Sequence, residues 1–179
     1  MPLLPIVRLG HPALRMPAEK VTAAELRSTA AQRLIDDMIE TMRAADGVGL
    51  AAPQVGVGWQ LFVYAAEEEI PLRVLVNPTV EPEAGDLVDD WEGCLSIPDL
   101  RGLVPRHPAV QVRGLDRHGR PLSYRAEGFE ARIVQHENDH LHAVVFLDRM
   151  RDMRSLAFLD EWHEYRVDGG GEPADERPE

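Results

Sequence analysis

The stretch FEARIVQHENDHLH, residues 129–142, repeats apolar and histidine side chains at three- and four-residue spacing. This spacing predicts a helix that carries Phe129, Ile133 and two histidines at three- and four-residue intervals. Four residues advance a helix by about 400°, so His136 and His140 project from one face and could share one metal ion. The sequence therefore predicts a metal-binding helix, around which the rest of the fold is expected to pack.

The same H-E-x-x-H pattern contains a carboxylate, Glu137. Helix geometry places it roughly 100° from His136 and roughly 60° from His140. That position suits a general base acting on a water molecule beside the ion. His142 points about 200° away from His140, so we do not expect it to be a ligand. The pattern alone also fits histidines that are ordinary polar positions on a half-buried helix.

A catalytic metal needs a third protein ligand and one open position. Cys94 is the single cysteine and lies in WEGCLSIP, residues 91–98. A thiolate with two imidazoles would form a Cys/His/His set that suits zinc or ferrous iron. Two alternatives stay open at this point. The lone cysteine could be a small buried apolar residue, or the third ligand could follow His140, where His163 and Glu161 are candidates.

Three blocks of sequence carry a family resemblance. GVGLAAPQ at 47–54, EGCLS at 92–96 and QHENDHL at 135–141 occur in the order of the three signature blocks of peptide deformylases. The chain resembles this family over most of its length, from HPALR at 11–15 to FLDRM at 146–150. The resemblance implies a metal-dependent amide hydrolase that removes the formyl group from N-formylmethionyl nascent polypeptides and releases formate.

The resemblance also implies a role for each reactive residue type. The implied metal ligands are Cys94, His136 and His140, and the implied catalytic acid and base is Glu137. The implied oxyanion donors are the Gln54 amide and the Leu95 backbone N–H. The implied substrate contacts are Gly49, Gly93 and Arg101.

The chain departs from the family pattern at one visible position. The family usually continues HLxG, whereas this chain has Ala143 at the glycine position, which leaves the local backbone after the helix in question.

Metal and partners follow from the same resemblance and from the charge of the chain. The resemblance favours ferrous iron, the Cys/His/His set suits zinc by geometry, and nickel and cobalt are further candidates. The implied partners are a formylmethionyl peptide and, transiently, the ribosome. A net charge of −12 gives no electrostatic footprint for nucleic acid or an anionic membrane. We therefore expect neither direct nucleic-acid specificity nor membrane binding.

Four other functions remain open from the sequence. A zinc endopeptidase, resting on the H-E-x-x-H pattern alone, would cut internal peptide bonds. An amidase of the same fold would act on a formyl or carbamoyl group of a small metabolite. A non-catalytic metal-binding protein would have no need for Glu137 and Gln54, which are not expected ligands. A cysteine-nucleophile hydrolase would be insensitive to chelators.

Around the predicted metal helix, the sequence indicates an α+β fold. Residues 22–45 have the spacing of an amphipathic helix that begins in a Thr22/Glu25 capping box and stops near Gly47. GVGLAAPQVGVG is expected to be a loop that leads into a strand. Further elements are expected as strands at 61–65, 74–80 and 110–115, a hairpin turn at 118–119 between 110–116 and 121–126, and a last helix at about 153–165.

These elements predict one compact domain over residues 1–167, with short antiparallel strands around a central metal-binding helix and a helix near each end. Residues 168–179 hold five acids, one arginine and no large apolar residue, so we expect a disordered acidic tail. No apolar run is long enough for a signal peptide or a membrane span. The expected location is the cytoplasm, and a processed organellar enzyme would have the same features.

Overall fold

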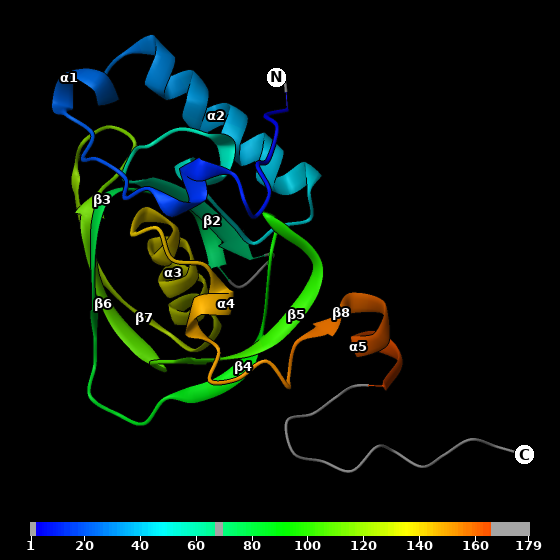
Figure 1. The fold of residues 1–179 in the computed structure, drawn as a ribbon. Helices are drawn as coiled ribbons and strands as arrows, with labels where there is room; N and C mark the ends of the chain where they lie inside the picture. Colours follow the sequence, from blue (N-terminus) through cyan, green and yellow to red (C-terminus); the bar gives the residue numbers. More distant parts are fainter. Residues whose placement is uncertain (1–2, 67–69, 166–179) are drawn as a thin grey trace, which may run out of the picture.

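The computed structural model describes residues 3–66 and 70–165, which form two antiparallel sheets around one helix. The larger sheet has the strand order β1-β2-β3-β6-β7 and the smaller has β4-β5-β8. Figure 1 shows helix α3 lying inside the curve of these sheets, with α2 across the outside of the larger one. The strands are β1 (Gly49–Ala51), β2 (Leu61–Ala66), β3 (Ile70–Pro82), β4 (Val88–Cys94), β5 (Ile97–Arg106), β6 (Ala109–Leu115), β7 (Pro121–Glu127) and β8 (Ala157–Phe158). The helices are α1 (Ala23–Leu26), α2 (Thr29–Ala44), α3 (Gly128–Leu141), α4 (Phe146–Arg149) and α5 (Leu159–Tyr165), with 3-10 turns at Pro12–Arg15 and Ala52–Val55.

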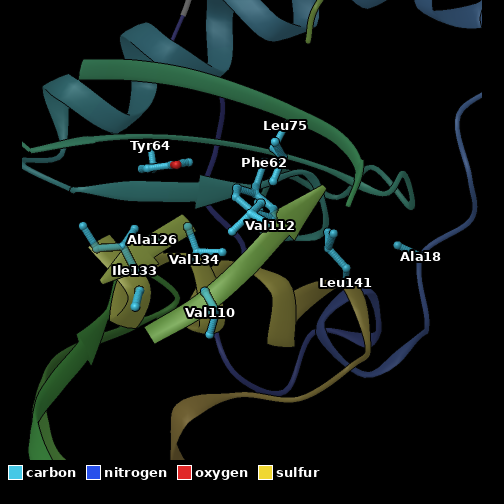
Figure 2. Packing of buried hydrophobic residues seen from close by; sticks show 12 residues of the cluster. Ala18, Phe62, Tyr64, Leu75, Val110, Val112, Ala126, Ile133, Val134 and Leu141 are labelled. Carbon is cyan, nitrogen blue, oxygen red and sulfur yellow. The ribbon is translucent and has the colours of Figure 1, made fainter. Parts of the chain in front are cut away.

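The main core lies between α3 and the larger sheet. Figure 2 shows Ile133, Val134 and Leu141 of α3 gathered with apolar side chains from the sheet, including Phe62 and Val112. These side chains are almost completely removed from water. Apolar burial of this kind stabilises a fold by about 25 cal/mol per Å². The predicted helix at 129–142 is therefore present, and its apolar stripe anchors it to the sheet.

A second core lies on the other face of that sheet, under α2. It contains Ile35, Met38 and Met42 of the helix and Leu61 and Val63 of β2. The prediction of one helix over 22–45 was wrong in one respect, because the chain forms two helices, α1 and α2. The break has a local cause. The Ser28 side chain accepts a hydrogen bond from the Ala31 N–H, which caps α2 and ends α1.

The predicted start of this helical segment is confirmed and its predicted stop is corrected. Thr22 and Glu25 form the capping box at the start of α1. α2 ends at Ala44, and the positive backbone angle that follows belongs to Asp46 (φ 51°) rather than to Gly47. The predicted loop at 47–58 contains more regular structure than expected, namely the short strand β1 and a 3-10 turn.

The sequence did not predict the β4–β5 hairpin, which carries Cys94 at the end of β4. This hairpin and α4 enclose a third apolar cluster of Cys94, Ile97, Val104, Val145 and Phe146. The hairpin was not predicted because β4 has the sequence VDDWEGC, which lacks the regular alternation of apolar and polar residues that indicates a strand. Glu92 in this strand is nevertheless buried, paired with buried arginines rather than with water.

The other expected hairpin is present, and the last helix is shorter than expected. β6 and β7 pair from Ala109–Glu127 to Leu115–Pro121, with the turn at the predicted place. The C-terminal helix α5 begins at Leu159 and not at 153, because Ala157 and Phe158 pair with β5 as strand β8. The predicted domain limit at 167 and the tail at 168–179 fall outside the described residues. Among the residues described, no helix is long and apolar enough to cross a membrane.

The end of α3 shows what Ala143 does in place of glycine. Ala143 has φ +62°, in the left-handed region. The Val144 N–H donates to the Asp139 carbonyl at 3.0 Å and the Ala143 N–H donates to the His140 carbonyl at 3.3 Å. This is the hydrogen-bond pattern of a Schellman C-cap, in which glycine is usual at the left-handed position. The alanine therefore keeps the expected helix end at the cost of backbone strain.

We predict that Ala143→Gly increases the free energy of unfolding by about 0.5–1 kcal/mol. The left-handed conformation costs a non-glycine residue about 1–2 kcal/mol, and glycine gives back about 0.5–1 kcal/mol through its larger entropy in the unfolded chain. Urea denaturation followed by circular dichroism would measure the change. A decrease in the free energy of unfolding would contradict the strain at this position.

Candidate active site

The structure brings the three predicted metal ligands together. Cys94 comes from the end of β4, whereas His136 and His140 come from one face of α3. One ligand atom from each lies within 4.8 Å of the others, and all three residues are buried. The Cys94 Sγ and His140 Nε2 atoms are 3.3 Å apart. Residues separated by more than forty positions in sequence therefore meet at one point.

This group of atoms passes a simple geometric test for a metal site. In a tetrahedral site, bond lengths of about 2.0–2.3 Å place neighbouring ligand atoms about 3.3–3.6 Å apart. The Sγ–Nε2 distance of 3.3 Å fits that spacing. One thiolate and two imidazoles are also donors that suit zinc or ferrous iron. The three residues therefore fit a divalent metal ion, and they leave room for a fourth ligand.

The alternatives for the third ligand lie elsewhere. His142 is exposed, and its Nδ1 hydrogen bonds to the Asn138 carbonyl at 2.8 Å, pointing away from His140 as helix geometry predicted. Glu161 and His163 are exposed on α5. The His163 ring packs against Trp162, with ring centroids 4.9 Å apart. None of these three side chains belongs to the ligand group among the described residues.

Glu92 holds the His136 ring in place. Its Oε2 atom lies 2.9 Å from His136 Nδ1, which leaves Nε2 as the nitrogen available for a ligand bond. Burial lowers the pKa of His136, but hydrogen bonds with Cys94 and Glu92 outweigh burial and raise that pKa well above its usual value. Burial lowers the pKa of His140 well below its usual value, which keeps that imidazole neutral. A bound cation would compete with the proton for the His136 ring.

An ion network joins Glu92 of β4 to β5, α3 and α4, and all of its side chains except that of Arg149 are buried. The Arg106 guanidinium, at the end of β5, donates to both Glu92 oxygens at 2.8 and 2.9 Å. It also donates to Asp139 of α3 at 2.6 Å. Arg132 of α3 donates to Glu92 at 2.9 Å, and Arg149 of α4 donates to Asp139 at 2.7 Å. Burial alone would raise the pKa of Glu92, but the arginine and histidine partners hold it far below the usual carboxyl value.

The predicted catalytic carboxylate, Glu137, lies next to the ligand group and against the backbone of Gly49. A Cβ atom built on Gly49 would lie 2.7 Å from Glu137 Cδ, so only glycine leaves room for the carboxylate. Glu137 is 4% exposed, and its Oε2 atom has no hydrogen-bond partner among the described residues. Burial raises the pKa of Glu137 to about 7. A carboxyl group with that pKa can accept and return a proton near neutral pH.

Gln54 is oriented by the backbone around it. Its Oε1 atom accepts a hydrogen bond from the Ala51 N–H at 2.8 Å, which fixes which end of the amide carries the NH2 group. The Nε2 atom then lies 3.4 Å from Cys94 Sγ and 3.3 Å from Ser96 Oγ. The Gln54 amide is 1% exposed and directs its N–H bonds toward the ligand group. Leu95, the other predicted oxyanion donor, follows Cys94 in the turn between β4 and β5.

Gly93 and Arg101 lie together at the edge of the site. The Arg101 guanidinium occupies the space that a side chain at position 93 would need, with Cζ 2.5 Å from a Cβ atom built there. Both residues line a cavity of about 620 Å³. Its wall includes Gly49, Gln54, Cys94, Leu95, His136 and Glu137. Every predicted site residue except His140 therefore borders one cavity, and His140 lies buried behind it.

The sequence indicated the proposed ligands and catalytic residues but not the buried side chains that hold them in place. Glu92 was part of the EGCLS block, yet it was not given a role. Ser96 and Asp139 lie in the EGCLS and QHENDHL blocks but were also given no role, and Arg106 was not singled out at all. The available signal was the presence of charged residues inside otherwise apolar runs, such as Arg106 at the end of LRGLVPR and Arg132 in EARIV. A charge in a buried run predicts a buried partner, although it does not identify that partner.

This chain is similar to known proteins over most of its length. The sequence profile of the family described as polypeptide deformylase matches residues 3–155. Peptide deformylase 2 of Bordetella bronchiseptica is 43% identical over 166 residues, which cover 87% of this chain and 92% of that protein. A crystal structure of a peptide deformylase from Synechococcus elongatus in complex with actinonin has a TM-score of 0.78 at 44% identity, covering 85% of this chain and 81% of that one. A Met-Ala-Ser bound structure of class I type b peptide deformylase from Acinetobacter baumannii has a TM-score of 0.78 at 37% identity, covering 83% and 98%.

We predict that Glu92→Gln weakens metal binding about 10–100-fold, the usual effect of losing a group that orients a ligand. The change keeps the shape of the side chain but removes the charge that holds His136, Arg106 and Arg132. Competition with a fluorescent zinc chelator would measure the affinity.

Asp89→Asn is a matched control for this experiment. Asp89 lies on the same strand and pairs with Arg151 at the surface. The Asp89→Asn variant should therefore bind metal as tightly as the unaltered protein. Equal metal affinity in the Glu92 and Asp89 variants would contradict the role assigned to Glu92.

Proposed function

The chain belongs to the polypeptide deformylase family, and on that premise we propose that Glu137 transfers protons beside a metal ion held by Cys94 and two histidines. The family assignment makes this chain a metal-dependent hydrolase that removes the N-formyl group from nascent polypeptides. Its antiparallel sheets and few helices match solved structures of the family.

One observation carries the proposal. Glu137, the oriented Gln54 amide, Cys94 and His136 border one cavity, and His140 completes the group of three side chains that could hold a metal ion. Hydrolysis of an amide needs an activated water, a donor for the oxyanion and a proton for the leaving amine. The cavity supplies a group for each of these needs.

The proposed ligands are Cys94, His136 and His140. When bound there, a divalent ion would act as a Lewis acid and lower the pKa of a water molecule toward neutrality. Among divalent ions we propose ferrous iron, in keeping with the resemblance that the sequence shows. Elemental analysis of protein purified without oxygen would decide between iron and zinc. A stoichiometric content of zinc under those conditions would overturn the proposal of iron.

The proposed acid and base is Glu137. Its carboxylate accepts a proton as water attacks the formyl carbon, and it returns that proton to the departing amine. One residue can serve both steps because burial raises its pKa to about 7, so the carboxyl group can both accept and give up a proton near neutral pH. Gly49 supports this role by letting the carboxylate sit against the β1 backbone. The products are formate and a peptide with a free amino terminus.

The proposed oxyanion donors are the Gln54 amide and the Leu95 backbone N–H. The carbonyl oxygen of the formyl group gains negative charge as the tetrahedral intermediate forms. Preorganised donors at that point contribute about 2.7–4 kcal/mol each. The bond from the Ala51 N–H to Gln54 Oε1 fixes the amide before substrate binds, so no reorganisation is needed during the reaction.

The substrate enters the same cavity. We place the methionine side chain against Val48, Phe129 and Ile133, the apolar residues that line the cavity beside His136. Ile133 and Phe129 precede His136 by three and seven residues, so all three side chains lie along one face of α3. Gly93 and Arg101 are proposed to contact the peptide backbone. Transient contact with the ribosome and a cytoplasmic location remain predictions from the family resemblance.

We predict that Glu137→Gln keeps its metal but loses about 10²–10⁴-fold in formate release from formyl-Met-Ala-Ser, the range expected for a general acid and base. Glutamine has the same shape but cannot accept a proton. A coupled formate dehydrogenase assay and elemental analysis of the same sample would measure both properties. Turnover close to that of the unaltered protein would exclude Glu137 from the proposed role.

We predict that Cys94→Ala loses its bound metal on dialysis against a chelator that the unaltered protein withstands. The thiolate is the one sulfur donor in the ligand group, and its loss leaves two imidazoles, too few for a stable catalytic site. Metal content per protein would be measured after dialysis, with circular dichroism as a check that the fold is retained. Full occupancy in the variant would remove Cys94 from the ligand set.

A further inference from the structure

Ser96 carries a buried hydroxyl group next to the proposed oxyanion donors. It follows Leu95 in the turn between β4 and β5, and it is 0% exposed. Its Oγ atom accepts a hydrogen bond from Gln54 Nε2 at 3.3 Å. The proposed reaction gives this hydroxyl group no part. A buried polar group in direct contact with the Gln54 amide can nevertheless control the direction in which that amide donates.

Two contacts hold the Gln54 amide, one at each end. The Ala51 N–H donates to Oε1, which fixes the end that carries the NH2 group. The last torsion of a glutamine side chain is broad, so this contact alone would let the plane of the amide swing. The contact from Nε2 to Ser96 Oγ fixes that plane. It occupies one of the two N–H bonds and leaves the other directed toward Cys94 Sγ, 3.4 Å away.

The backbones of Gln54 and Ser96 are also held by one segment, although the two residues are 42 positions apart. The Val7 N–H donates to the Gln54 carbonyl and the Leu9 N–H donates to the Ser96 carbonyl, both at 2.9 Å. These bonds keep the 3-10 turn of Gln54 beside the β4–β5 turn. Because Ser96 directly follows Leu95, its hydroxyl group and the Leu95 N–H keep a fixed relation to each other.

We propose that Ser96 is a positioning residue for the reaction. Its hydroxyl group accepts one N–H of the Gln54 amide, so that the other N–H is directed at the developing oxyanion beside the Leu95 N–H. This inference rests on the proposed function, because it takes Gln54 as an oxyanion donor. Ser96 acts through Gln54 and not on the substrate itself. Its loss should therefore slow the chemical step and leave substrate binding nearly unchanged.

A purely structural explanation is that Ser96 only supports the turn between β4 and β5. The two explanations differ in how Ser96 depends on Gln54. Damage to the turn slows the reaction by the same factor whether or not Gln54 is present. A positioning effect disappears once the Gln54 amide is gone, because nothing remains to be directed.

The test is a double-mutant cycle on metal-loaded protein with formyl-Met-Ala-Ser as the substrate. Ser96→Ala should lower kcat and kcat/KM by the same factor, about 3–10-fold, and leave KM within about 2-fold of the unaltered value. Gln54→Ala should lower kcat about 10²–10³-fold, as expected for the loss of an oxyanion donor. The double variant should match Gln54→Ala within about 2-fold. Metal content and urea unfolding of each variant check that folded, loaded proteins are compared.

Thr41→Ala is the matched control. Thr41 also has a buried hydroxyl group, which accepts from the Leu4 N–H at 2.9 Å and donates to the Asp37 carbonyl at 2.6 Å. It lies on α2 and does not line the cavity. Its loss should therefore leave kcat unchanged even where it lowers the free energy of unfolding.

Two results would overturn the role of Ser96. One is an unchanged kcat in Ser96→Ala, and the other is an equal loss from Ser96→Ala in the presence and in the absence of Gln54. Failure of the proposed function would look different. In that case Gln54→Ala itself would keep the kcat of the unaltered protein, which would overturn the oxyanion role of Gln54 and the role of Ser96 together.

Discussion

The buried contact between Arg106, Glu92 and Asp139 determines the geometry of the site. One guanidinium at the end of β5 binds a carboxylate of β4 and a carboxylate of α3, and all three side chains are almost fully removed from water. Removing one partner of a buried ion pair costs about 3–5 kcal/mol, because the charge left behind has no water to solvate it. The hairpin and the helix therefore cannot separate at low cost. These are the two elements that carry Cys94 and the histidines, so the same contact that joins them also constrains the distance between the proposed ligand atoms.

The groups around the ligands are held in the same way, by contacts that exist before any substrate arrives. The Gln54 amide is oriented by a backbone N–H, the His136 ring by Glu92, and the Glu137 carboxylate by the glycine backbone of β1. The N-terminal segment adds to this support, because the Val7 and Leu9 N–H groups donate to the Gln54 and Ser96 carbonyls at 2.9 Å. Catalysis by preorganised dipoles depends on such fixed positions. In this chain, hydrogen bonds and close contacts position these groups, although the groups come from segments distant in sequence.

Local rules were sufficient to predict α3 from the sequence. Its apolar spacing and the four-residue separation of His136 and His140 are properties of a helix whatever surrounds it. The capping box of Thr22 and the turn at 118–119 are local in the same sense. The β4–β5 hairpin could not be found in this way, because its buried Glu92 and Arg106 look like surface residues until the partner from the other strand is known. For the same reason, the position of Cys94 as a ligand rested on the family resemblance and not on periodicity.

The central claim is that one thiolate and two imidazoles of this chain hold the metal ion. X-ray absorption spectroscopy of zinc-loaded protein tests this claim directly, because sulfur and nitrogen neighbours differ in distance and scattering. The expected coordination shell has one sulfur at about 2.3 Å and two nitrogens at about 2.0–2.1 Å from the ion. A coordination shell made only of nitrogen and oxygen would contradict it.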